Sequence, residues 1–159
     1  MAIQAIRQPE GRVRQVGKVV TQVTITNKAD ETLAAHGFRP ESAIRTLSLD
    51  EVLVDTGATT LCLPLDLVRA LGLEHVRDIV VSTATSVDQV GLYEGARVTV
   101  HGRSATVECM ALPVGAPPLL GVIPLEMLGL EPDLQNRRLR LLPETGRETH
   151  YLAPSPVIR

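Results

Sequence analysis

Asp55 is the residue of this sequence whose setting best fits chemistry. It follows three apolar residues, Val52 to Val54, and precedes a Thr-Gly turn in the stretch EVLVDTGATTLCLP, residues 51–64. A run that is apolar throughout predicts a strand buried on both faces, so we expect the Asp55 carboxylate at the floor of a site and not on a solvated surface. Because an ionised carboxylate is costly to bury without a partner, this position indicates a functional role.

The sequence lacks the motifs of several other enzyme classes. The sequence contains no G-x-S-x-G elbow, no Walker loop and no G-x-G-x-x-G. Its four histidines are separated from one another and from the two cysteines, so no zinc-ligand spacing exists, and we expect neither a metal nor an organic cofactor. Cys62 has an apolar setting without a nearby histidine, which favours a buried core thiol over a nucleophile. We expect Cys62 and Cys109 to be reduced and not joined in a disulfide.

Length and composition limit the remaining possibilities. The 159 residues fit one domain with a hydrophobic core. Sixteen Lys and Arg against eighteen Asp and Glu, with no long run of either sign, exclude the charge pattern of a nucleic-acid or membrane partner. Phe38, Tyr93 and Tyr151 are too few aromatics for base stacking. The N-terminus lacks an apolar core of signal-peptide length and no stretch approaches a membrane span, so we expect a cytoplasmic protein.

The elements that must position Asp55 are short strands and two small helices. Residues 16–27 alternate β-branched and polar residues as a half-buried strand does, whereas residues 28–42 predict a surface excursion with room for one helical turn. Further strands are predicted at residues 44–49, 52–54, 78–87, 90–100, 105–112 and 138–142. A proline near the start and a glycine near the end predict short helices at 63–72 and 123–130. This pattern is typical of a mostly β domain.

A second motif accompanies Asp-Thr-Gly-Ala, residues 55–58. After a strand-rich interval, Leu119, Leu120 and Gly121 place two hydrophobic residues and a glycine directly before the second predicted helix. Together the two motifs resemble those of the retropepsin-like single-domain aspartic proteases, in particular their bacterial relatives. The resemblance covers residues 16–142 and implies an acid protease half-barrel with two short helices. It leaves residues 1–15 as an N-terminal segment and candidate dimer strand, and residues 143–159 as a C-terminal tail.

The resemblance implies an aspartic endopeptidase that cuts peptide or protein substrates. In such enzymes two carboxylates share a proton, and one acts as general base on a water while the other acts as general acid. None of the other six aspartates is followed by Thr-Gly or Ser-Gly. The resemblance therefore implies a homodimer in which each chain contributes Asp55 at the two-fold axis.

The family pattern gives roles to the residues around Asp55. Thr56 braces the two loops across the dimer, and the Gly57 backbone N–H stabilises the carboxylate while the missing side chain permits close approach. Leu119, Leu120 and Gly121 support the loop from behind.

Substrate contacts are expected from the loop and from a hairpin flap. Ala58 and Thr59 line a subsite, and the connection around residues 82–91 occupies the position of the flap. The flap residues expected to contact substrate are Thr83, Ala84 and Thr85.

The sequence departs from the viral members at three places. The flap tip lacks glycine, Thr59 and Thr60 replace acidic residues, and Val122 replaces an arginine that ties the subunits together. Substrate and dimer contacts must therefore differ. Hydrophobic side chains on either side of the cut bond are expected from the apolar residues Leu61, Leu63, Val114 and Leu120.

Two other functions stay open. A dimeric peptide-binding or scaffolding module would keep the fold without catalysis, and the tip without glycine favours it. A monomeric β domain with an accidental motif is the third hypothesis. The intact Asp-Thr-Gly-Ala motif argues against the binding module, and the placement of the second motif argues against an accidental match.

Overall fold

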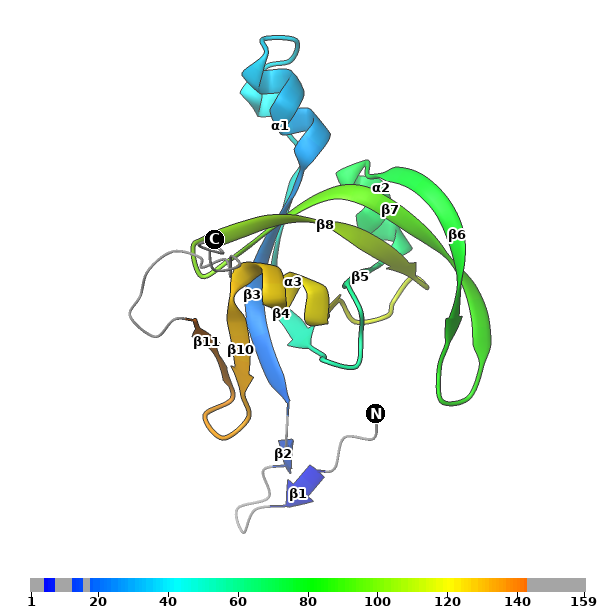
Figure 1. Ribbon diagram of the computed structural model, residues 1–159, viewed down its shortest axis with the longest axis vertical. Helices are drawn as coiled ribbons and strands as arrows, with labels where there is room; N and C mark the ends of the chain where they lie inside the picture. The colour runs from blue at the N-terminus through cyan, green and yellow to red at the C-terminus, as the bar shows by residue number, and fades with distance from the viewer. Residues whose placement is uncertain (1–4, 8–12, 16–17, 143–159) are drawn as a thin grey trace, which may run out of the picture.

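A seven-stranded sheet forms the centre of the molecule in the computed structural model, which describes residues 5–7, 13–15 and 18–142. The strand order is β3-β4-β9-β5-β8-β7-β6. The strands are β3 (Val19–Asn27), β4 (Thr46–Val54), β5 (Leu61–Pro64), β6 (Glu74–Ser82), β7 (Val87–Val100), β8 (Arg103–Leu112) and β9 (Leu119–Leu120). Because β3 pairs with β7 as well as with β4, the sheet closes into a barrel, and β6 continues it as the outer strand of a long hairpin with β7 (Figure 1).

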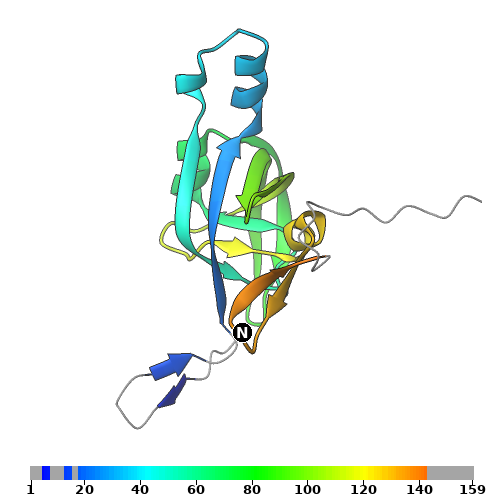
Figure 2. The same cartoon turned by 90° about the vertical axis from the view of Figure 1, so that its left-hand side faces the viewer.

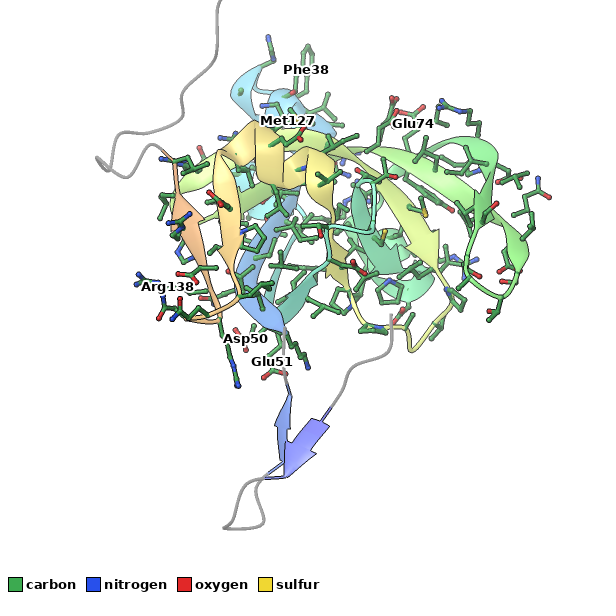
Figure 3. The ribbon with its side chains drawn as sticks, turned by 60° about the horizontal axis from the view of Figure 1, so that its bottom comes forward. Phe38, Asp50, Glu51, Glu74, Met127 and Arg138 are labelled. Carbon is green, nitrogen blue, oxygen red and sulfur yellow. The ribbon has the colours of Figure 1, made fainter. Side chains whose placement is uncertain are left out.

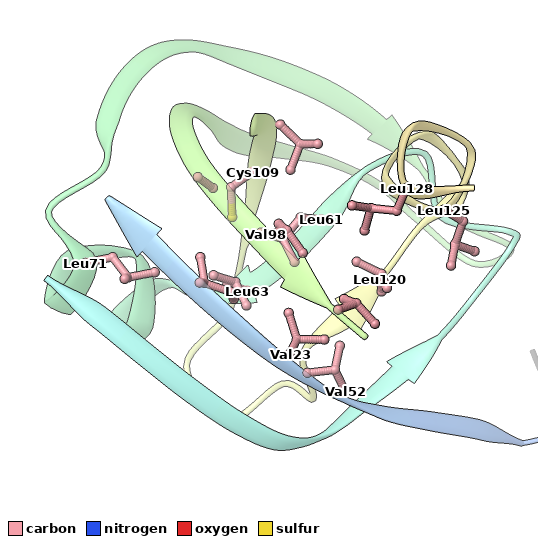
Figure 4. Close-up of a cluster of buried hydrophobic side chains, with 14 of the residues drawn as sticks. Val23, Val52, Leu61, Leu63, Leu71, Val98, Cys109, Leu120, Leu125 and Leu128 are labelled. Atoms are coloured by element: carbon pink, nitrogen blue, oxygen red, sulfur yellow. The ribbon is translucent and has the colours of Figure 1, made fainter. Parts of the chain in front are cut away.

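The barrel interior is the hydrophobic core. Alternate residues of β3 are buried, as a strand with one face on the core requires. Leu61, Val98 and Leu120 have no exposed surface and lie together inside the barrel (Figure 4). The half-buried strand predicted for residues 16–27 is therefore confirmed for its described part.

Two short helices follow the pattern that proline and glycine predict. Helix α2 (Leu65–Leu71) ends at Gly72 with φ 62°, and α3 (Val122–Leu128) ends at Gly129 with φ 63°. Both glycines adopt the left-handed conformation that closes a helix and that a side chain would disfavour. The prediction missed β5, because Leu61 to Pro64 extends as a strand before α2 begins.

The surface excursion after β3 contains a third helix, so the expectation of two helices is wrong. Helix α1 (Lys28–Ala35) is followed by a 3-10 turn (Glu41–Ala43), and both project beyond the barrel (Figures 1 and 2). The side chain of Asn27 accepts a hydrogen bond from the Asp30 amide at 3.0 Å, as a helix N-cap does. The same side chain donates to the carbonyl of Leu71 at 2.8 Å, which fixes the excursion to α2. Phe38 lies on this excursion, at the opposite end of the barrel from Asp50 and Glu51 (Figure 3).

Strand β4 is continuous where the sequence predicts two strands. Thr21 pairs with Val52 and Val23 pairs with Leu49, so Asp50 and Glu51 lie in a bulge. A bulge accommodates an extra residue without ending the strand, which explains why two acidic residues interrupt the sequence pattern but not the sheet. The hairpin between β6 and β7 also turns at residues 83–86, earlier than the predicted strand ends.

Two small antiparallel pairs lie outside the seven-stranded sheet. They are β10 (Leu130–Asp133) with β11 (Arg138–Leu141), and β1 (Ala5–Arg7) with β2 (Val13–Gln15). The strand predicted at residues 138–142 is confirmed, whereas its partner β10 was not predicted. The role of residues 1–15 at a dimer interface stays a prediction, and the tail at 143–159 lies outside the described residues. Over the described part of the chain, no helix has the length and apolarity needed to cross a membrane.

Candidate active site

Asp55 begins a tight turn at the end of β4. Its Oδ1 accepts a hydrogen bond from the Gly57 amide at 2.9 Å, and its carbonyl accepts one from the Ala58 amide at 3.1 Å. An aspartate side chain that bonds the backbone two residues ahead is a common way to stabilise a turn. The carboxylate is thereby oriented by the backbone of its own loop.

The Asp55 loop, residues 55–60, is attached to β9 and α3 by backbone hydrogen bonds. The Asp55 amide donates to the Leu120 carbonyl at 3.0 Å, and the Gly121 amide donates to the Thr60 carbonyl at 3.0 Å. The Val122 amide donates to the Ala58 carbonyl at 2.9 Å. Strand β9 also lies between β4 and β5, pairing with both ends of the loop. The second motif therefore holds the first in place.

Gly121 is required at this contact for reasons of space. A Cβ atom there would lie 2.5 Å from the carbonyl oxygens of both Ala58 and Thr60. Its φ of −88° is available to any residue, so the restriction comes from the closeness of the loop and not from backbone conformation. Any side chain at this position must displace the Asp55 loop.

The outer side of the loop is open in the single chain. Asp55 is half-buried, and Thr56 and Gly57 are exposed. Val52 is buried, but Leu53 and Val54 are only half-buried, so the expectation of a strand buried on both faces is wrong. In this run, one face of β4 packs on the core, and the other face is only partly covered.

A cavity of about 550 Å³ lies between the Asp55 loop and the β6–β7 hairpin, and we call it the cleft. Gly57 to Thr60 line one side, and residues 79–83 of the hairpin line the other. Asp55 itself does not line the cleft, although Gly57 to Thr60 of the same loop form part of its wall. The cleft is therefore adjacent to the loop that carries the Asp55 carboxylate.

Residues 50–127 match the model of a family described as gag-polyprotein putative aspartyl protease. This segment includes the Asp55 loop, the hairpin, β9 and Gly121. This part of the chain is therefore similar to that family. Among solved structures, the chain is similar to the solution structure of the simian foamy virus (mac) protease, with 17% identity and a TM-score of 0.41 over 67% of this chain and 90% of that chain. None of the curated proteins compared with the chain matches it.

The hairpin between β6 and β7 turns without glycine. The Thr83 amide donates to the Ser86 carbonyl at 2.8 Å, and the Ser86 amide donates to Thr83 Oγ1 at 3.0 Å. Neither Ala84 nor Thr85 has a positive φ, so the turn needs no glycine. Of the hairpin residues predicted to contact substrate, Thr83 lines the cleft, whereas Ala84 and Thr85 do not. From the loop, Ala58 and Thr59 both line it.

The apolar residues expected to line the cleft do not do so. Leu61, Leu63 and Leu120 are fully buried in the core, and Val114 is exposed on a loop away from the cleft. For the three leucines the error is one of register, because successive residues of a strand face opposite sides. The apolar lining that the sequence analysis missed comes from Ile79, Val81, Leu92, Met110, Leu112, Leu119 and Ile123. The alternation along residues 105–112 was the signal that could have identified Met110 and Leu112.

The two cysteines are free and buried, as predicted. Cys62 lines the cleft with 3% of its surface exposed. Burial, followed by the negative charge of Asp55, raises the pKa of the Cys62 thiol to about 11. Burial likewise raises the pKa of Cys109 to about 12. Both thiols are protonated at neutral pH, which makes them poor nucleophiles.

The residues that replace the viral pattern have structural roles here. Thr60 is buried and its hydroxyl donates to the Glu108 carbonyl at 2.7 Å, which ties the loop to β8. Val122 begins α3 and lies beside the loop. Within the described residues, no group of three or more His, Cys, Asp or Glu side chains is placed to hold a metal ion.

Proposed function

We propose that the protein is an aspartic endopeptidase that acts as a homodimer, with Asp55 from each chain forming the catalytic pair. The observation that carries this proposal is the position of Asp55 itself. Its loop is fixed by β9 and α3, open on the outer side and adjacent to a cleft, within the segment that matches the aspartyl protease family.

The two carboxylates would divide the catalytic roles. Like charges a few ångströms apart cannot both ionise readily, so one Asp55 is ionised and the other holds the proton. The ionised group removes a proton from water as the water oxygen attacks the scissile carbonyl, and the protonated group donates to the carbonyl oxygen. Proton transfer to the amide nitrogen then breaks the C–N bond and gives a carboxylic acid and an amine.

Within the described residues, three of the other aspartates are engaged by side chains away from the Asp55 loop. Asp30 is bound by Arg45, Asp78 contacts His75, and Asp133 is bound by Asn136. Among the residues that line the cleft, Glu108 is the one carboxylate, and it lies on β8. A second copy of the chain is therefore the simplest source.

An apolar surface beside the loop supports this pairing. A second cavity, of about 460 Å³, is lined by Thr56, Val122 and mostly apolar residues of α3 and β10, including Leu125, Met127 and Leu130. Val122 stands where the viral members carry an arginine, so an apolar contact would replace a charged one. Docking of a second copy here would bring its loop next to Thr56 and Gly57.

Cleavage of a diverse peptide library between acidic and neutral pH tests the proposal. We expect cleavage by the wild type and none by Asp55→Asn, with a pH profile set by the coupled carboxylates. Binding without cleavage at every pH would favour the second candidate, a dimeric peptide-binding module, which the hairpin tip without glycine supports.

Mixing wild-type and Asp55→Asn chains tests whether the carboxylates are shared. At concentrations where dimers form, an equal mixture that pairs at random contains about one quarter wild-type dimers. Activity should therefore fall to about one quarter of that of the same total amount of wild-type chain. A fall to one half would show that each chain works alone and would contradict the shared pair.

A further inference from the structure

The floor of the cleft is a single row of side chains that crosses the sheet. Leu119 pairs with Cys62, Cys62 with Met110, Met110 with Leu92, and Leu92 with Arg77. All five residues line the cleft. Four of them are apolar, and the row ends on the outermost strand with a cation.

A bulge in β6 puts Arg77 at the end of this row. His75 pairs with Tyr93 and Arg77 pairs with Leu92, so Val76 is the extra residue. Without the bulge, Val76 would be opposite Leu92 and the row would be apolar throughout. Bulges commonly redirect a side chain in this way. Arg77 also shares its face of the strand with Ile79 and Val81, which are half-buried against the cleft.

Arg77 has no ion pair or hydrogen bond through its side chain within the described residues. The nearby Asp78 carboxylate contacts His75 Nε2 at 2.9 Å instead. Glu108 lines the same cleft but makes no ion pair with Arg77. A guanidinium group that ends an apolar row is well suited to bind a carboxylate, because its planar fork can donate two parallel hydrogen bonds.

We propose that Arg77 determines specificity by binding an acidic side chain of the peptide substrate. The proposal rests on the proposed peptidase function and adds a substrate class to it. Four strand spacings of about 4.8 Å separate Leu119 from Arg77, roughly six residues of extended peptide. Because an arginine side chain is long enough to extend over the neighbouring strand, we expect the contact about three to five residues from the cut bond. In a two-fold dimer each chain supplies one Arg77, so an acidic residue is preferred on both sides.

The expected preference is moderate. Arg77 is exposed, and exposed ion pairs contribute little, whereas a paired hydrogen bond to a carboxylate contributes more. We expect kcat/KM for a peptide with Glu at the contact position to exceed that for Gln by about three- to tenfold, with Lys lower still. The preference should shrink at high salt.

The experiment compares peptides that differ only by Glu, Gln or Lys at each position three to five residues from the cut bond. Arg77→Met should remove the preference for Glu, and Arg77→Glu should reverse it toward Lys. Arg77→Lys should keep only a part of it, because lysine retains the charge but not the planar fork. Arg69→Met is the matched control, because Arg69 is exposed on α2 and does not line the cleft. This control changes the net charge equally and should leave the preference intact.

The possible failures can be told apart. Cleavage without a preference for Glu, or with a preference that Arg77→Met leaves unchanged, overturns this inference and leaves the peptidase intact. If nothing is cleaved, binding of the same peptides is measured by fluorescence anisotropy. Preferential binding of the Glu peptide that Arg77→Met abolishes supports recognition by Arg77 without catalysis. Absence of both cleavage and binding overturns both proposals.

Discussion

Two aspartates at opposite ends of the barrel, Asp30 and Asp55, have opposite surroundings. Asp30 has 1% of its surface exposed and accepts four hydrogen bonds, three from Arg45 and one from Arg39. Asp55 is half-buried and accepts the hydrogen bond of the Gly57 amide. One carboxylate is surrounded by permanent partners, and the other leaves room for a ligand.

This difference fits a structural role for Asp30 and the catalytic role proposed for Asp55. The hydrogen bonds from Arg45 are the main cause that lowers the pKa of Asp30 to about 2, so this group stays ionised at neutral pH. A group held so firmly in one protonation state cannot act as a general acid or base near neutral pH. Asp55 uses Oδ1 to accept from the Gly57 amide, and the proposed acid-base role would use its second oxygen.

The largest expected effect is the loss of activity in Asp55→Asn, compared with the same replacement at Asp30. Asp55→Asn should lower kcat/KM by about a thousandfold or more, because an amide cannot transfer the proton. The melting temperature should change little, since the amide oxygen can still accept from Gly57. Peptide cleavage and thermal unfolding of Asp55→Asn and Asp30→Asn, measured side by side, check this. Equal loss of activity in both variants would remove the distinction between the two sites.

Gly121→Ala should both destabilise the fold and impair cleavage. The added Cβ lies 2.5 Å from two backbone oxygens of the Asp55 loop, so the loop must move, at a cost of about 2–3 kcal/mol in the free energy of unfolding. Urea unfolding and peptide cleavage measure the two effects. Gly102→Ala is the control, because its φ of 78° is strained for alanine but no atom lies within 4 Å of the added Cβ. We expect Gly102→Ala to cost about 1–2 kcal/mol and to keep the activity of the folded protein.

The sequence predicted Asp55 but not Asp30, and the reason is physical. Asp55, Thr56 and Gly57 form their turn from consecutive residues, so the motif is visible in the sequence. The second motif predicted the contact at Gly121 because relatives share that arrangement. The main partner of Asp30 is Arg45, which lies 15 residues later at the far end of the excursion. The excursion has no apolar periodicity, so no local sequence pattern indicates this pair. A mostly β domain of short strands could be predicted from the sequence pattern, whereas the half-barrel came from the family resemblance.

The lining of the cleft was predicted less well, because it depends on register. Cys62, and not Leu61 or Leu63, faces the cleft, and a shift of one residue reverses the assignment. Arg77 reaches the cleft through a bulge at Val76 that no residue type in β6 signals. Strand pairing decides both the side that Cys62 faces and the position of the bulge, and residue types within one strand do not reveal how it pairs.

Asp30→Asn should reduce stability while leaving the site unchanged. Loss of the charge weakens the contacts to Arg45 and Arg39, and we expect a decrease of about 1–2 kcal/mol in the free energy of unfolding, because both arginines are partly exposed and screened by solvent. Urea unfolding at neutral pH measures it. Asp50→Asn is the control, since Asp50 is exposed and accepts one long hydrogen bond of 3.3 Å from Gln22. Its unfolding should match that of the wild type, and cleavage per folded molecule should be unchanged in both variants.

The pH dependence of that difference should identify its cause. A carboxylate whose pKa is lower in the folded protein than in the unfolded chain stabilises the fold above the unfolded value and loses this effect as pH falls through the folded value. For Asp30 the pKa is 3.8 in the unfolded chain and about 2 in the folded protein. The difference in unfolding free energy between wild type and Asp30→Asn should therefore be constant above about pH 5, decrease between pH 3.8 and about 2, and vanish below that. Urea unfolding from pH 7 to about pH 1 measures it, with Asp50→Asn as reference for the general effect of acid. A difference that persists at the lowest pH would mean that the shape and hydrogen bonds of Asp30, and not its charge, hold the excursion to the barrel. Asp30 and Asp55 would then differ in packing and not in the role of their charge.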